Sequence, residues 1–128
     1  METKSYILST RISTVKLKTN EILEIDIQED QNFSSEDMRD LIDAAYKIGS
    51  GKKFKNLINV GAYTVPDLAA IKFSCSKKGS KYKIADASII HTLAQKIIAT
   101  FYLRMNKPAV PTKFFNNATD AETWLLAI

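Results

Sequence analysis

The spacing of the apolar residues changes at residue 34, and this change constrains the fold more than any other feature of the sequence. Before it, residues 12–17 and 22–27 alternate apolar with polar side chains, and the polar turn 19–21 separates them. A period of two predicts a β-hairpin that buries one face. After it, stretches with apolar residues every three or four positions alternate with short stretches typical of strands. That order predicts parallel strands covered by helices.

The predicted fold is therefore α/β, with a mixed β-sheet in which an N-terminal antiparallel hairpin is followed by α-β-α-β-α-β-α. Further strands are expected at residues 6–8, 54–60, 82–87 and 111–115. Four residues are expected to cap helix starts, namely Ser34, Thr64, Ser88 and Thr119. The third helix has the most regular apolar spacing, which predicts a buried stripe made of Ile90, Leu93, Ala94, Ile97, Ile98 and Phe101.

Composition fits one domain over residues 1–128, because 45% of the residues are apolar and 25% are charged. The single cysteine, Cys75, excludes a disulfide within the chain and a cysteine-based zinc site. No apolar run approaches the roughly 20 residues that cross a bilayer. The first eight residues are too polar for a signal peptide. We therefore expect a cytoplasmic protein without a transmembrane segment.

The charges are unevenly distributed along the chain. Residues 1–45 carry five Lys/Arg against ten Asp/Glu, and residues 46–128 carry thirteen against four. Most basic clusters follow predicted helices and several acidic residues begin them, which are the positions that the helix dipole favours. The sequence has neither aromatic residues interleaved with the basic clusters nor helix-turn-helix spacing. Nucleic acid is therefore not expected as a partner.

Residues with catalytic potential are few. His91 is the only histidine and is expected in the first turn of the third helix. Asp86, Ser88 and His91 lie too close in sequence for a catalytic triad, whose members converge from separate elements. The segment Gly49-Ser50-Gly51-Lys52 follows a helix, whereas a phosphate-binding loop joins a strand to a helix. We expect no catalytic residue, metal site or cofactor, and hence no enzyme.

Two surfaces are candidates for binding. The first is the edge where strands run into helices, with Tyr63, Thr64, Ser88 and His91, which would hold an anion or a polar ligand head unless these residues only cap helices. The second involves the helix expected at 64–76, which is apolar nearly all round. Its Phe73, with Tyr102 and Leu103 of the third helix, would meet a partner protein, a second copy in a homodimer or an apolar ligand, unless they pack against a neighbouring helix.

The chain resembles the STAS domains, the fold of bacterial anti-sigma factor antagonists, and especially their STAS/CRAL-TRIO-like relatives. The resemblance covers nearly the whole chain and rests on the element order and on four segments. These segments are Tyr82-Lys83-Ile84-Ala85, the helix end from Phe101 to Pro108, Val110-Pro111-Thr112-Lys113-Phe114-Phe115 and Ala121-Glu122-Thr123-Trp124-Leu125.

This resemblance implies a regulatory module that binds a partner protein, or alternatively one that binds or carries an apolar small molecule or lipid. In the antagonists, a serine in an Asp-Ser motif at the start of the second helix is phosphorylated. The corresponding segment here is Val60-Gly61-Ala62-Tyr63-Thr64, which has no Asp-Ser pair. Only Thr64 is available as a phosphorylation site, and the missing motif argues against such a switch.

Overall fold

The computed structural model describes residues 7–128 and contains a six-stranded mixed sheet in the order β1-β2-β3-β5-β7-β8. The pairings β1–β2 and β2–β3 are antiparallel, and the pairings β3–β5, β5–β7 and β7–β8 are parallel. The sheet strands are β1 Ile7–Ser9, β2 Ser13–Leu17, β3 Ile22–Ile27, β5 Phe54–Val60, β7 Lys83–Ile89 and β8 Thr112–Phe115. The predicted mixed α/β fold is confirmed; residue 6 of the expected first strand lies outside the described residues.

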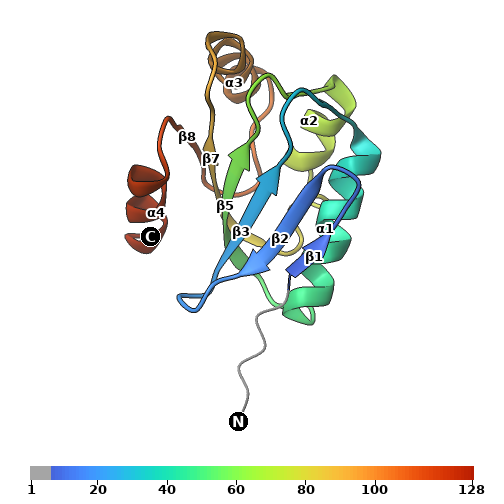
Figure 1. The fold of residues 1–128 in the computed structure, drawn as a ribbon, viewed down its shortest axis with the longest axis vertical. Helices are drawn as coiled ribbons and strands as arrows, with labels where there is room; N and C mark the ends of the chain where they lie inside the picture. Colours follow the sequence, from blue (N-terminus) through green and yellow to red (C-terminus); the bar gives the residue numbers. More distant parts are fainter. Residues whose placement is uncertain (1–6) are drawn as a thin grey trace.

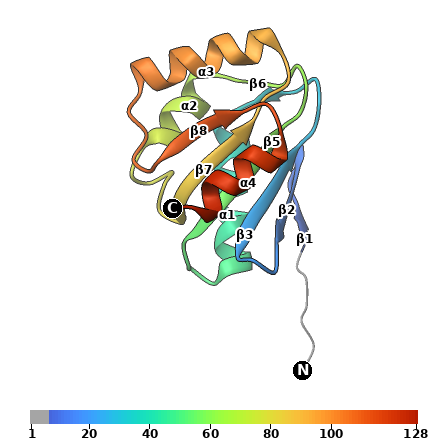
Figure 2. The ribbon, with the colours of Figure 1, turned by 90° about the vertical axis from the view of Figure 1, so that its left-hand side faces the viewer.

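Four helices surround this sheet, and two short strands pair apart from it. The helices are α1 Ser35–Gly49, α2 Leu68–Cys75, α3 Leu93–Met105 and α4 Ala118–Leu126. The short strands β4 Asn32–Phe33 and β6 Val65–Pro66 are parallel to each other. Figure 1 shows α1 and α2 on one side of the sheet and α4 on the other. Figure 2 shows α3 lying across the end of the sheet toward which β5 and β7 run.

Of the four predicted helix caps, one is confirmed and three are wrong. Ser34 caps α1, and its capping box with Asp37 is present as predicted. The prediction for Thr64 is wrong, because residues 65–66 are extended as β6 and Asp67 caps α2 by accepting from the Ala70 N–H at 2.8 Å. The prediction for Ser88 is wrong as well, because β7 continues through Ile89 and Thr92 caps α3.

In α4, Asn117 replaces the expected Thr119 as the cap. Asn117 accepts from the Asp120 N–H at 2.8 Å. Apolar spacing predicts that this helix buries Ala121, Trp124, Leu125 and Ile128. Ala121 and Leu125 are fully buried and Trp124 is half-buried, whereas Ile128 is 50% exposed, so the prediction is wrong for Ile128.

The predicted buried stripe of α3 is wrong for four of its six residues, and only Ile90 and Ile98 are half-buried. Leu93, Ile97 and Phe101 are 73%, 61% and 56% exposed. The helix instead turns Gln95 and Ala99 inward. The Gln95 side-chain amide donates to the carbonyl oxygens of Gly61 and Thr64, at 2.8 and 2.9 Å. These long-range bonds fix the rotation of α3, and apolar spacing carries no information about them.

Candidate functional site

Strand β7 presents different side chains to the two faces of the sheet, since side chains alternate along a strand. Ala85, Ala87 and Ile89 face α4 and belong to an apolar core with Leu125. Asp86 and Ser88 face the other way and line a cavity. Because Ser88 is small and Asp86 is held by polar partners, the sheet does not fill the space beneath α2 and α3.

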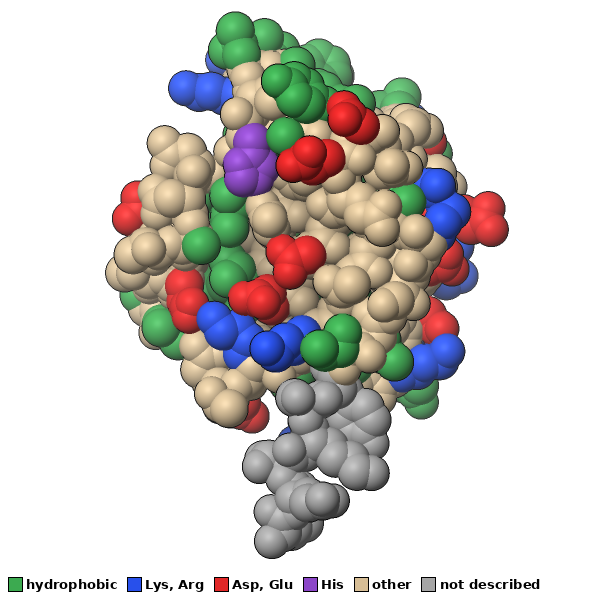
Figure 3. Space-filling model, viewed as in Figure 1, with side chains coloured by type: hydrophobic (Ala, Val, Ile, Leu, Met, Phe, Trp, Pro, Cys, Tyr) green, Lys and Arg blue, Asp and Glu red, His purple; other side chains and the backbone are tan. Residues whose placement is uncertain are grey.

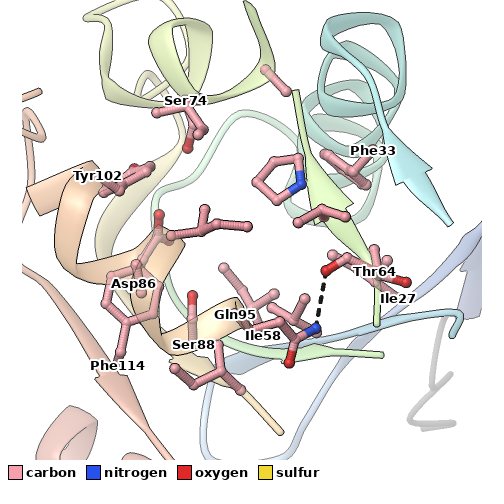
Figure 4. A pocket seen from close by; sticks show the side chains of 18 of the residues that line it. Ile27, Phe33, Ile58, Thr64, Ser74, Asp86, Ser88, Gln95, Tyr102 and Phe114 are labelled. Carbon is pink, nitrogen blue, oxygen red and sulfur yellow. Dashed lines mark hydrogen bonds between the residues drawn. The ribbon is translucent and has the colours of Figure 1, made fainter. Parts of the chain in front are cut away.

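The resulting cavity has a volume of about 120 Å³ and lies between the sheet, α2 and α3. Its walls are mostly apolar, and Figure 4 shows side chains from several elements pointing into it. The residues labelled there are Ile27, Phe33, Ile58, Thr64, Ser74, Asp86, Ser88, Gln95, Tyr102 and Phe114. Space of this kind suits a small apolar body with a few polar contacts.

A buried polar cluster lies at the side of this cavity. The ammonium group of Lys83 donates to Asp86 Oδ2 at 2.8 Å and to Ser74 Oγ at 3.1 Å. Asn56 Nδ2 donates to Asp86 Oδ1 at 2.8 Å. A second cavity of about 60 Å³ touches Asn56, Ser74 and Lys83. The cluster therefore places hydrogen-bonding groups next to an apolar space.

Tyr102 reaches into the cavity from α3 and packs edge-on against Phe114, with ring centroids 5.8 Å apart. Burial raises the pKa of the Tyr102 hydroxyl above its ordinary value. The side chain is therefore a neutral phenol at physiological pH, and its contribution to the cavity is that of an aromatic wall with a polar tip.

A separate groove runs on the outside between α3 and β8, and we call it the α3–β8 groove. It is open, has a volume of about 620 Å³, and is lined by residues of α3, β8 and the segment before α3. Lys96 and Lys113 are the charged residues that line it, and no Asp or Glu does. The apolar residues around it are Ile90, Leu93, Ala99, Leu103, Phe114 and Phe115.

The exposed side of α3 extends the apolar surface beyond this groove. Leu93, Ile97, Phe101 and Met105 follow one another at intervals of four and form what we call the outer row. Figure 3 shows hydrophobic side chains gathered at the end of the molecule where α3 lies, with basic atoms at their margin and acidic atoms below them. An apolar surface of this kind on a single chain is typical of an interaction site.

The structure brings three of the predicted site residues together and separates the others. Thr64, Ser88 and Tyr102 all line the cavity. His91 and Leu103 line the α3–β8 groove. The groups missed at the sequence level include Asn56, Ser74, Lys83 and Gln95. Only Gln95 carried a local signal, since it follows Thr92 at capping-box spacing.

His91 precedes α3 and is exposed, contrary to the predicted position in its first turn. Its Nε2 lies 2.7 Å from Asn59 Oδ1. Tyr63 is 67% exposed in the loop after β5, with a φ of 65° in the left-handed region. Phe73 is half-buried, and the guanidinium carbon of Arg39 lies 4.9 Å from the centre of its ring. Phe73 is therefore packed within the chain, and the homodimer through Phe73, Tyr102 and Leu103 stays a prediction.

Thr64 is 1% exposed, and its hydroxyl holds the loop between β3 and β4. The hydroxyl donates to the Gln28 carbonyl and accepts from the Gln31 N–H at 3.1 Å. Gly61 begins the turn that leads to Thr64, and a side chain at this position would collide with the Gln28 backbone. A kinase reaches the Thr64 hydroxyl only after this loop opens.

Two features of other binding and membrane proteins are absent from the part of the chain that the structure describes. Within residues 7–128, no three His, Cys, Asp or Glu side chains are grouped so that they could hold a metal ion. None of the helices in that range is long and apolar enough to cross a membrane.

Comparison with known proteins gives a family and a fold. The model of a domain family of unknown function, DUF7793, matches residues 15–128. The chain is similar to a solved crystal structure of an uncharacterized protein of the DUF3478 family from Shewanella loihica PV-4, which has a SpoIIAA-like fold. The two are 18% identical with a TM-score of 0.57, over 95% of this chain and 92% of that one. No curated protein matches. The predicted STAS-like resemblance is confirmed for the fold.

Proposed function

We propose that this chain, which belongs to the DUF7793 family and has a SpoIIAA-like fold, is a non-enzymatic regulatory module. It binds an acidic segment of a partner protein in the α3–β8 groove. The observation that carries this proposal is the lining of the groove, which combines apolar side chains with Lys96 and Lys113 and has no acidic residue. The outer row of α3 offers further apolar surface for the same partner.

Charge indicates what kind of partner fits. Residues 87–119 contain four Lys/Arg and no Asp or Glu. Two copies of α3 packed together would bring like charges close, and like-charge pairs across an interface are unfavourable. An acidic segment gains attraction to Lys96 and Lys113 instead, and charge steering also speeds its association.

The position of β8 suggests how the segment lies. β8 is the last strand in the sheet order, so within residues 7–128 no further strand pairs with its outer edge. Consecutive residues 113–116 line the groove, although side chains alternate between the two faces of a strand. The groove therefore follows the edge of β8, where an extended segment gains backbone hydrogen bonds.

A site-specific photo-cross-linker tests this proposal in the cells that make the protein. Thr100 lines the groove and is exposed, and Thr14 of β2 is an exposed control. We expect a linker at residue 100 to capture a protein through a segment with more Asp and Glu than Lys and Arg, and a linker at residue 14 not to do so. A synthetic peptide of that segment should bind at least tenfold more weakly to Lys113→Glu, while binding to Lys16→Glu on β2 stays unchanged.

Three outcomes contradict the proposal. Capture of a second copy through residue 100, together with a concentration-dependent dimer in sedimentation, favours the homodimer. Capture of lipid there, with binding to phosphatidylserine vesicles, makes the groove a membrane site. Equal capture at residues 14 and 100, or equal peptide binding to Lys113→Glu and Lys16→Glu, means that the groove binds no acidic partner.

A second candidate function is the binding of a small apolar molecule, and the cavity of about 120 Å³ beneath α2 and α3 favours it. Its size suits a body about as large as one aromatic ring, since a cavity of about 150 Å³ takes a single benzene. Native mass spectrometry of the protein purified from its own cells tests this function. A bound mass that Ser88→Leu removes would support the cavity as the site.

A further inference from the structure

We propose that the ligand of the cavity of about 120 Å³ is a small neutral molecule with an apolar body and one polar group, and that this group forms a hydrogen bond with the Ser88 hydroxyl. The inference rests on the second candidate function above and names the ligand chemistry that the cavity would select. The feature that carries it is a buried hydroxyl that lines the cavity and has no hydrogen-bond partner within the described part of the chain.

Ser88 lies on the floor of the cavity, where β7 runs between β5 and β8, and is 8% exposed. It is in register with Ile58 of β5 and with Phe114 of β8, and all three residues line the cavity. Side chains in register on adjacent strands project from the same face of a sheet. The Ser88 hydroxyl therefore lies between two apolar side chains that offer it no acceptor, and Figure 4 shows it pointing into the cavity.

The other uncharged polar side chains of the cavity wall are occupied within the fold. The Gln95 amide donates to two backbone carbonyls and accepts from two backbone N–H groups. The Thr64 hydroxyl holds the loop before β4, and the Thr112 hydroxyl donates to a backbone carbonyl at 3.0 Å. Ser74 Oγ accepts from an ammonium group at 3.1 Å, and the Tyr102 hydroxyl lies against the end of α2. These contacts leave the hydroxyl on the floor of the cavity as the polar group for a ligand.

The charges around the cavity favour a neutral ligand. Among the described residues that line it, Asp86 is the only charged one, and its carboxylate is paired with the ammonium group of Lys83 at 2.8 Å. An anion would face this carboxylate with no cation in the wall to balance it. A cation would have to compete with Lys83 for a buried partner, and an unpaired buried charge is costly. A neutral molecule avoids both costs.

The Ser88 hydroxyl is within reach of a molecule in the cavity. In the described part of the chain, Asn56 Oδ1 is the fully enclosed side-chain atom without a partner, and Ser88 Oγ is not enclosed in this way. A serine hydroxyl both donates and accepts, so a hydroxyl or a carbonyl group on the ligand satisfies it. With a body the size of one ring, phenols, small cyclic alcohols and small cyclic ketones belong to this class.

Phenol and toluene test this inference, because they have nearly the same shape and differ in one polar group. NMR titration of the methyl groups that line the cavity measures the binding of both, and we expect both to bind the wild-type chain. In Ser88→Ala, the ratio of phenol to toluene affinity should fall about tenfold, because phenol alone loses a hydrogen bond. Thr112→Val removes another hydroxyl of the same wall, which is bonded within the chain, and should leave the ratio unchanged.

The outcomes separate the inference from the function on which it rests. If both compounds bind and the ratio is the same in Ser88→Ala, the cavity binds apolar molecules and the assignment to Ser88 is wrong. If neither compound binds the wild-type chain, the cavity function fails together with the inference. Ser88→Ala should also be at least as stable as the wild type in urea, because a hydroxyl without a partner adds no stability. A clear loss of stability would mean that the hydroxyl is bonded within the fold, and it would overturn the inference.

Discussion

The two faces of β7 differ in what they pack against. The face toward α4 presents Ala85, Ala87 and Ile89 to a core that is closed by Leu125. The face toward α2 and α3 presents Asp86 and Ser88 to a polar cluster and a cavity. The same strand therefore supports dense packing on one side and leaves space on the other. The α4 side is therefore closed by packing, whereas the α2 and α3 side holds the cavity that we propose as a binding site.

The largest expected effect concerns the polar side of this comparison. Lys83→Met should lower the free energy of unfolding by about 3–5 kcal/mol, because it leaves the buried Asp86 charge without its partner. Urea unfolding measures the change. Lys83→Met combined with Asp86→Leu should recover most of the loss, since an apolar pair of similar volume leaves no buried charge. A single variant as stable as the wild type would mean that Lys83 and Asp86 are not paired inside the fold.

In the core beneath α4, a substitution should change the free energy of unfolding only through the volume of side chain that it removes. Leu125 is 0% exposed in the core beneath α4, so Leu125→Ala should cost about 2–5 kcal/mol in urea unfolding. Leu126, the next residue, is 57% exposed, and Leu126→Ala should change stability by less than about 0.5 kcal/mol. Equal effects of the two substitutions would contradict the docking of α4 on β7.

The elements of the fold that the sequence predicts correctly are those with local signals. The hairpin and the strand 54–60 follow from local spacing and are confirmed at almost the predicted residues. The cap of α1 follows from Ser34 and Asp37, which are three residues apart. Each of these signals lies within a few neighbouring residues, so the sequence alone is enough to find it.

The rotation of α3 and the polar cluster depend on contacts between distant residues. Gln95 reaches the Gly61 carbonyl, 34 residues away, and Asn56 reaches Asp86, 30 residues away. Apolar spacing in α3 therefore predicts the wrong buried face, and the sequence gives no reason to bring Asn56 and Asp86 together. The sequence does predict Thr64, Ser88 and Tyr102 as candidate site residues, and all three line the cavity. The capping role that it also predicts for Thr64 and Ser88 is wrong.

The next expected effect is a loss of stability at low pH. Both α1 and α3 begin with a capping box, but the box of α1 contains a carboxylate and the box of α3 is neutral. Hydrogen bonds from Arg11 and then from Ser34 lower the pKa of Asp37 to about 2, although burial opposes the shift. As the pH falls, the Asp37 carboxylate is protonated in the unfolded chain before it is protonated in the folded chain. The stabilisation of the fold by ionised Asp37 is therefore complete above about pH 4. About 2 kcal/mol should be lost between pH 4 and pH 2.

Urea unfolding across this pH range checks the prediction. Asp37→Asn should remove this part of the pH dependence, whereas Asp43→Asn, at an exposed position of α1, should keep it. The box of α3, made of Thr92 and Gln95, contains no titrating group and should contribute nothing to the slope. An unchanged slope in Asp37→Asn would contradict the pairing with Arg11.

The smallest expected effect concerns the outer row of α3. Ile97 is 61% exposed, so Ile97→Gln should change the free energy of unfolding by less than about 0.5 kcal/mol. Ile98, one residue later, lines the cavity, and Ile98→Gln should cost more than 1 kcal/mol because it places an amide among apolar walls. Urea unfolding of the two variants shows which of the two side chains is buried. A large loss for Ile97→Gln as well as for Ile98→Gln would restore the buried stripe that apolar spacing predicts, and α3 would then have no apolar row to offer a partner.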